Sequence, residues 1–90
     1  MKEIAFDDKK LIWIWDNQET SAAQLPLNNL FILDAQGREV WNMKDCVGYD
    51  DVCVGMHKVE DDSFYFVTFM GLGFTIDLHR FQVLKKQMTK

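Results

Sequence analysis

The side chains in this sequence that are best able to carry nucleophilic or metal chemistry are two cysteines and two histidines. Cys53 and His57 stand four residues apart in an alternating apolar stretch that is typical of a β-strand. In a strand this spacing puts both side chains on one face but about 13 Å apart, at roughly 3.3 Å per residue. A catalytic thiolate and its base, or two ligands of one zinc ion, must lie far closer together. Because Cys46 would also have to fold back from a loop, we predict neither a catalytic cysteine nor a metal site.

The other candidate motifs have simpler structural explanations. Asp77 and His79 stand on a short predicted strand with the same spacing problem, and no serine lies in a glycine-rich elbow. Gly71 and Gly73 enclose a segment too short to cradle a phosphate group, and no helix is predicted after them. We interpret both glycines as turn residues. The sequence therefore predicts a protein that is not an enzyme and that holds no cofactor.

The charge distribution limits the kinds of partner. The 90 residues carry a net charge of −4, and the basic residues occur singly or in pairs. No basic stripe is present that would neutralise a nucleic-acid backbone, so we predict no nucleic-acid binding. A surplus of carboxylates suits a basic protein partner. It also suits an ordinary solvated surface, where net charge maintains solubility.

No feature of the sequence indicates export or membrane insertion. The first ten residues, MKEIAFDDKK, contain acidic side chains and no long apolar run, unlike a signal peptide. No stretch approaches the ~20 apolar residues that span a bilayer. We therefore predict a cytoplasmic protein, without membrane contact, in which Cys46 and Cys53 stay reduced.

Short apolar stretches separated by turn signals predict an all-β fold. The segment Asn17–Asn28 interrupts this pattern, and we interpret it as a loop with at most one short helical turn. We expect one domain over residues 1–90, a single antiparallel meander of seven or eight short strands that forms a curled sheet or a small barrel. The predicted strands are Glu3–Phe6, Lys10–Asp16, Asn29–Asp34, Arg38–Met43, Asp51–Val59, Phe64–Met70, Phe74–Leu78 and Phe81–Lys86.

The sequence pattern of the hairpin predicted over Asn29–Met43 is repeated near the end of the chain. Asp34 begins its turn, because an aspartate can accept hydrogen bonds from the backbone two residues on, and a glycine follows. At an offset of 43 residues Asp34 falls on Asp77. The same offset sets Phe31 on Phe74, Leu33 on Ile76, Val40 on Val83 and Trp41 on Leu84, and it puts Arg80 where the turn glycine would be.

The stretch LFILDAQGREVWNM, which ends at Met43, resembles the repeat of quinoprotein-type (PQQ-like) β-propellers. In that repeat a strand ends in an aspartate, a glycine turn follows, and the next strand ends in a tryptophan. The stretch is also similar to small uncharacterised bacterial proteins, some of which look like immunity proteins of toxin systems. The resemblance implies that Trp41 serves packing, and it supplies no catalytic residues. A full propeller needs at least four blades, so quinone chemistry is not implied.

The aromatic residues give the best indication of a binding surface. Two predicted strands, KLIWIWD and FYFVTFM, are apolar on both faces, whereas a small domain buries only one face of a sheet against its own core. A closed barrel or a homodimer would cover the second face. The sharper hypothesis is an aromatic surface with an acidic rim, which suits a basic protein. Its predicted residues are Trp13, Trp15, Tyr65, Asp50, Asp51, Glu60, Asp61 and Asp62.

We therefore expect a non-enzymatic protein-interaction module of bacterial type, and within that class an immunity or inhibitor protein that binds a basic partner. Two alternatives remain open at this point. One is a β-barrel that binds a small ligand among its aromatic side chains, and the other is a structural subunit of a homo-oligomer.

Overall fold

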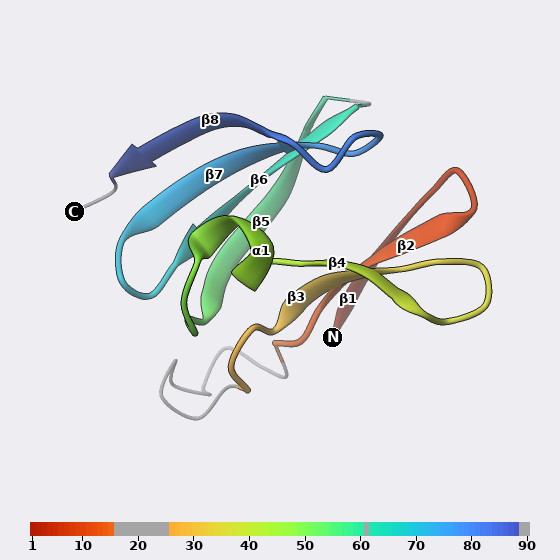
Figure 1. Ribbon diagram of the computed structural model, residues 1–90, viewed down its shortest axis with the longest axis horizontal. Helices are drawn as coiled ribbons and strands as arrows, with labels where there is room; N and C mark the ends of the chain where they lie inside the picture. The colour runs from red at the N-terminus through yellow and green to blue at the C-terminus, as the bar shows by residue number, and fades with distance from the viewer. Residues whose placement is uncertain (16–25, 61, 89–90) are drawn as a thin grey trace. The chain divides into compact units, whose positions relative to one another are not determined.

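The computed structural model describes residues 1–15, 26–60 and 62–88, and this part of the chain forms eight strands and one short helix (Figure 1). The all-β prediction is confirmed. The elements are β1 (Lys2–Phe6), β2 (Lys9–Trp13), β3 (Leu30–Leu33), β4 (Glu39–Asn42), α1 (Lys44–Val47), β5 (Cys53–Glu60), β6 (Ser63–Thr68), β7 (Leu72–Asp77) and β8 (Val83–Met88).

The strands form two antiparallel sheets, each a meander of four strands in sequence order, β1-β2-β3-β4 and β5-β6-β7-β8. The expectation of one continuous sheet or barrel is therefore corrected, since no closed barrel forms among the described residues. The reason lies after β4, where the chain turns into α1 instead of a hairpin, so β4 and β5 do not pair. The chain divides into two compact units, Met1–Val52 and Cys53–Lys90.

In the first unit, the apolar side chains that alternate along β2 and β3 are the most deeply buried. Leu11 pairs with Ile32 and the half-buried Trp13 with Leu30, so the buried Leu11, Leu30 and Ile32 lie on one face of the sheet. Leu11, Leu30 and Ile32 have no exposed surface, and Trp41 on β4, opposite Ile32, is 4% exposed. Aliphatic and aromatic side chains at alternate positions are what the pleat of a half-buried sheet requires.

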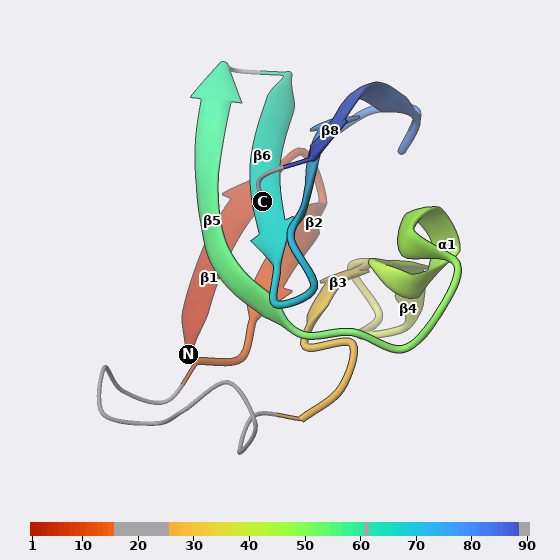
Figure 2. The ribbon, with the colours of Figure 1, turned by 90° about the vertical axis from the view of Figure 1, so that its left-hand side faces the viewer.

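In the second unit, the buried face is aromatic. Phe66 pairs with Phe74 across β6 and β7, and Phe64 pairs with Ile76. The Phe66 ring is stacked between those of Phe64 and Phe74, with centroid distances of 6.0 and 5.3 Å. All four side chains are at most 1% exposed. Figure 2 shows β5 and β6 running beside each other in this sheet.

Gly73 lies inside β7, so the prediction that it is a turn residue is wrong. A β-carbon at this position would collide with the Tyr65 hydroxyl oxygen and would lie 3.1 Å from the Cζ atom of that ring. It would also lie 3.2 Å from Cγ of Gln87, whose amide donates to the Tyr65 hydroxyl at 3.1 Å. The glycine makes room for an aromatic ring laid across the strand.

The turns of the two repeated hairpins both begin with an aspartate that accepts backbone N–H groups. Asp34 accepts the backbone N–H groups of Gln36 and Arg38 through Oδ1, both at 2.9 Å. Asp77 accepts those of His79 and Arg80 through its own Oδ1, at 2.7 and 3.1 Å. The predicted role of both aspartates in starting a turn is confirmed.

The second turn is one residue longer than the first, which corrects the alignment expected from the sequence. The backbone N–H of Asp34 donates to the carbonyl of Arg38, but that of Asp77 donates to the carbonyl of Gln82. The left-handed residue is Gly37 in the first turn, with φ +82°, and Phe81 in the second, with φ +56°, so Arg80 does not replace the glycine.

Beyond the turn, equivalent residues of the two hairpins are 44 positions apart in the sequence, instead of the expected 43. Leu33 pairs with Glu39 and Ile32 with Trp41, and the equivalent pairs in the second hairpin are Ile76 with Val83 and Thr75 with Lys85. Both ladders carry a register shift between these two pairs. Trp41 therefore corresponds to Lys85 and Val40 to Leu84, and the predicted matches of Trp41 with Leu84 and of Val40 with Val83 are wrong.

α1 is a single turn held by side chains near the end of β4. The Asn42 amide oxygen accepts the Lys44 backbone N–H at 2.9 Å, and the Asp45 carboxylate accepts the Asn42 backbone N–H at 3.1 Å. The sequence prediction placed a helical turn inside Asn17–Asn28 instead, and most of that segment lies outside the described residues. No helix in the described ranges is long and apolar enough to cross a membrane.

Cys46 and Cys53 do not form a disulfide bond with each other. The Sγ atom of Cys46 lies 3.2 Å from the carbonyl oxygen of Met43, and that of Cys53 lies 3.3 Å from the carbonyl oxygen of Gly55. Each thiol thus contacts the backbone of its own unit.

Candidate functional site

Two neighbouring asparagines hold together the parts of the first unit that carry its predicted binding residues. The Asn29 amide donates to the carbonyl of Ile14 at 2.9 Å, and the Ile14 backbone N–H donates to the Asn29 carbonyl, also at 2.9 Å. The Asn28 amide donates to the Asp50 carboxylate at 3.0 Å. The segment around Ile14 and the segment around Asp50 are therefore fixed to one dipeptide.

Trp13 and Trp15 flank the Ile14 segment that Asn29 fixes. Their ring centroids are 5.5 Å apart with an interplanar angle of 40°, and both side chains are half-buried. The Asn29 side chain itself is buried, so its hydrogen bond to Ile14 is partly shielded from water. The two indole rings are thus held in place while part of each remains at the surface.

Asp50 is exposed and has two partners. The Asn28 amide is the first cause that lowers the pKa of the Asp50 carboxyl, and the second is the Lys44 ammonium group, 3.0 Å away. Both favour the charged carboxylate. Asp50 is therefore an exposed, charged carboxylate, which is what the predicted acidic rim requires of it.

Asp51 is buried, contrary to the prediction that it belongs to an exposed acidic rim. Asp51 is 4% exposed. The Asn28 backbone N–H donates to the Asp51 carbonyl at 2.7 Å, and this hydrogen bond holds the Asp51 backbone against the segment that contains Asn28. Its Oδ1 atom accepts the Val52 backbone N–H at 2.7 Å, whereas its buried Oδ2 atom has no hydrogen-bond partner among the described residues.

Two exposed apolar side chains that the sequence analysis did not select adjoin the same asparagines. Leu27, which precedes Asn28, is 60% exposed, and Tyr49, which precedes Asp50, is 44% exposed. The signal for Tyr49 was its position after Gly48 in a turn next to two aspartates. We use the name Asn28 surface for five side chains that belong to, or adjoin, the segments that Asn28 and Asn29 connect: Trp13, Trp15, Leu27, Tyr49 and Asp50.

The other predicted binding residues belong to the second unit. Tyr65 is half-buried on β6, where its ring centroid lies 5.3 Å from that of His57. Glu60 is exposed at the end of β5, and the exposed Asp62 carboxylate lies 2.7 Å from Nε2 of His79. Asp61 lies outside the described residues. The predicted set is therefore divided between two units, and the Asn28 surface contains only its first part.

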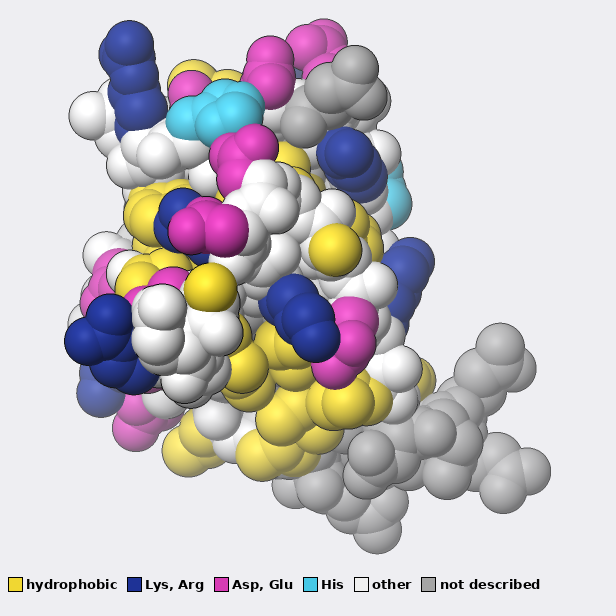
Figure 3. Space-filling model, turned by 90° about the vertical axis from the view of Figure 1, so that its right-hand side faces the viewer, with side chains coloured by type: hydrophobic (Ala, Val, Ile, Leu, Met, Phe, Trp, Pro, Cys, Tyr) yellow, Lys and Arg dark blue, Asp and Glu magenta, His cyan; other side chains and the backbone are white. Residues whose placement is uncertain are grey.

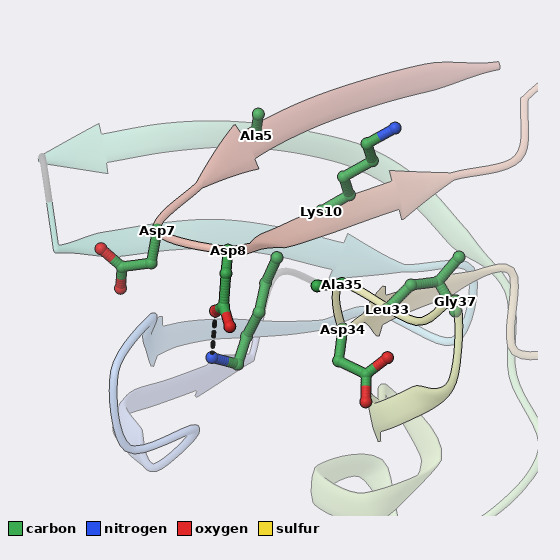
Figure 4. A pocket seen from close by; sticks show the side chains of 9 residues that line it. Ala5, Asp7, Asp8, Lys10, Leu33, Asp34, Ala35 and Gly37 are labelled. Atoms are coloured by element: carbon green, nitrogen blue, oxygen red, sulfur yellow. Dashed lines mark hydrogen bonds and ion pairs between the residues drawn. The ribbon is translucent and has the colours of Figure 1, made fainter.

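A hollow of about 320 Å³ opens between the β1–β2 and β3–β4 turns of the first unit (Figure 4). The predicted strands imply each of these turns, but nothing in the sequence indicates that the two turns are neighbours. In an antiparallel meander, alternate turns lie at the same end of the sheet, which brings them together. The hollow is lined by Ala5, Asp7, Asp8, Lys9, Lys10, Leu33, Asp34, Ala35 and Gly37.

Three of the charged groups of this hollow, Asp8, Lys9 and Asp34, form hydrogen bonds or an ion pair within their own turns. The Lys9 ammonium donates to the Asp8 carboxylate at 2.9 Å, which lowers the pKa of Asp8 and raises that of Lys9. The backbone N–H of Arg38 is the largest of the causes that lower the pKa of Asp34. In Figure 4 the carboxylates of Asp7, Asp8 and Asp34 are spread apart and do not converge on one point.

Neither the hollow nor the remaining described residues offer a cluster of three or more histidine, cysteine or carboxylate side chains that could hold a metal ion. The lining of the hollow contains carboxylates, ammonium groups and small apolar side chains, without thiol, imidazole or hydroxyl groups. On the face of the molecule shown in Figure 3, acidic and basic side chains are interspersed. The Asn28 surface, which combines aromatic rings with an ionised carboxylate, is therefore the better candidate for binding.

No family model, curated protein or solved structure matches the chain. The resemblance to PQQ-like repeats and to immunity-type proteins thus stays a prediction.

Proposed function

We propose that this protein is an interaction module whose first unit binds a partner protein with a basic surface. The observation that carries the proposal is the uneven division of charge. Met1–Val52 contains ten carboxylate and five basic side chains, a net charge of −5. Cys53–Lys90 contains four carboxylate and five basic side chains, a net charge of +1. The carboxylate surplus belongs to the unit that carries the Asn28 surface.

The Asn28 surface has the composition of a binding interface. The few residues that dominate the binding energy at interfaces are enriched in tryptophan and tyrosine, and a side chain held rigidly before the partner arrives loses less entropy on binding. Asn29 holds the segment between Trp13 and Trp15, and Tyr49 adds a third aromatic ring. The negative field of the unit accelerates the approach of a basic partner and orients it. An immunity-type inhibitor, which covers a basic surface of its target, would be one such module.

A site-specific crosslinking experiment tests this proposal. A photoreactive amino acid replaces Tyr49 in one variant and the exposed Val59 on β5 of the second unit in another, and each is irradiated in a lysate of the source cells. We expect the first variant alone to capture a specific protein, and we expect that protein to have a basic surface. Its dissociation constant for the purified chain should rise steeply with salt, because the attraction is between exposed charges.

Matched substitutions locate the surface on the purified pair. We expect Trp15→Ala to weaken binding by at least tenfold, the loss typical of an aromatic anchor. Asp50→Lys should slow association several-fold and reduce the salt dependence. Asp62→Lys in the second unit is the control, with the same change of charge and little effect expected. An acidic partner, or equal losses from Asp50→Lys and Asp62→Lys, would contradict the proposal.

A further inference from the structure

β8 is an open edge of the second sheet. It is the last strand in the order β5-β6-β7-β8, and all six of its residues are exposed. Its apolar side chains Val83, Leu84 and Met88 are 44%, 58% and 70% exposed. A strand at a sheet edge pairs on one side only, so its outward N–H and C=O groups are available to another extended chain.

The edge formed by β8 is more regular than the other edge of the sheet. β5 carries two register shifts, one between Cys53 and Gly55 and one between Lys58 and Glu60. Such irregularities hinder the addition of a further strand. β8 has a single shift at its beginning, and from Lys85 to Met88 it pairs with β7 residue by residue.

Two adjacent lysines give this edge a charge preference. Lys85 stands opposite Thr75 and Lys86 opposite Phe74, so the two ammonium groups lie on opposite faces of the strand. The Lys86 ammonium is 5.8 Å from the centroid of the Phe74 ring. Neither lysine forms an ion pair within the part of the chain that the structure describes.

A second copy of the chain fits this edge poorly. If two β8 strands paired antiparallel over their full length, Lys85 of each copy would stand opposite Lys86 of the other. Like charges directly opposite each other destabilise a strand pair. A strand with two adjacent carboxylates at its centre would instead meet both lysines with opposite charge.

We propose that β8 receives an extended acidic segment of another protein by strand addition. The backbone of that segment pairs with the outward side of β8, two neighbouring carboxylates lie opposite Lys85 and Lys86, and apolar side chains lie opposite Leu84 and Met88. The backbone hydrogen bonds supply affinity, and the side chains select the segment and its register. This proposal concerns the second unit and an acidic partner, so it does not depend on the proposed function of the first unit.

The test uses the full chain and a synthetic six-residue peptide, acetylated and amidated, with two adjacent glutamates at its centre between apolar residues. Titration into isotope-labelled protein is followed by backbone amide chemical shifts. We expect the shifts to concentrate on β8 and β7. Two control peptides are used: one has lysines in place of the glutamates, and the other is N-methylated at alternate positions, which removes backbone donors while keeping the side chains.

Variants of the protein complete the design. Exchanging both lysines, K85E with K86E, should weaken binding of the glutamate peptide at least tenfold and should make the lysine peptide the better ligand. Lys58→Glu on β5 is the matched control and should leave binding unchanged. Equal binding of the N-methylated peptide, shifts centred on the first unit, or peptide-free β8 shifts that change with protein concentration would each overturn the proposal. The last result would mean that a second copy occupies the edge.

Discussion

The hairpins β3–β4 and β7–β8 share one backbone plan but bury opposite faces. Each begins with an aspartate that accepts two backbone N–H groups, and each has a register shift at the same place in its ladder. In the first hairpin Ile32 and Trp41 are buried, and their counterparts Thr75 and Lys85 are half-buried and exposed. In the second hairpin it is Ile76 that is buried, and its counterpart Leu33 is half-buried.

The comparison separates two physical causes. The turn aspartate determines the path of the backbone, because its hydrogen bonds are local. The distribution of apolar side chains determines which face becomes the core, because burial depends on what each strand packs against. The shared turn aspartate therefore gives similar hairpins in two places, but the two hairpins bury different faces.

The largest difference should appear at the equivalent positions Trp41 and Lys85. Trp41→Ala removes a side chain that is 4% exposed, and we expect it to lower the free energy of unfolding by about 3 to 5 kcal/mol. Lys85→Ala removes an exposed side chain and should change it by less than about 0.5 kcal/mol. Chemical denaturation followed by circular dichroism measures both. Equal losses in the free energy of unfolding for Trp41→Ala and Lys85→Ala would contradict the different burial of the two positions.

The next effect should come from Gly73, whose counterpart in the first hairpin is the buried Leu30. Gly73→Ala introduces a β-carbon into the space of the Tyr65 ring, and we expect a loss of about 1 to 3 kcal/mol. The same substitution together with Tyr65→Ala should cost less than the sum of the two single changes, because the collision is removed. Simple additivity in this double-mutant cycle would exclude steric contact with Tyr65 as the cause.

A smaller effect is expected at the left-handed turn positions, Gly37 and Phe81. No other atom lies within 4 Å of a β-carbon built on Gly37, so Gly37→Ala should cost only the backbone strain at φ +82°, about 1 kcal/mol. Phe81→Gly relieves strain at φ +56° but loses a half-buried ring, so its net cost should be smaller than that of Gly37→Ala. Thermal unfolding of the two variants compares them directly, and a larger cost for Phe81→Gly would contradict this account.

The smallest effect is the pH dependence that the two turn aspartates share. Backbone N–H groups lower the pKa of both Asp34 and Asp77 below the ordinary value of 3.8, the Arg38 N–H acting most strongly on Asp34 and the His79 N–H on Asp77. Each therefore contributes stability that is fully present above about pH 3.8 and is lost as the pH falls through the lowered folded-state pKa. Asp34→Asn and Asp77→Asn should each flatten the loss of stability below pH 4, as measured by denaturation between pH 6 and pH 2. An unchanged slope would show that these carboxyl groups are not preferentially stabilised in the folded state.

The sequence by itself determined the strands and the two aspartate turns, because alternation of apolar residues and aspartate hydrogen bonding act over a few residues. It also selected Trp13, Trp15 and Asp50 for the Asn28 surface. It missed Leu27 and Tyr49, since nothing in a single sequence shows that Asn28 and Asn29 connect distant segments. It also placed Asp51 at the surface, because an aspartate beside another aspartate has the composition of a solvated turn.

Only the tertiary structure decided three features of the protein. These are the division into two sheets, the burial of Asp51, and the correspondence of the exposed Lys85 in the second hairpin to the buried Trp41 in the first. Each of these depends on long-range pairing. One additional residue in the second turn moves all of β8 by one position, and in a strand such a step transfers every side chain to the other face. The turn residues determine where the chain reverses direction. The packing of the strands on either side of the turn determines which side chains are buried.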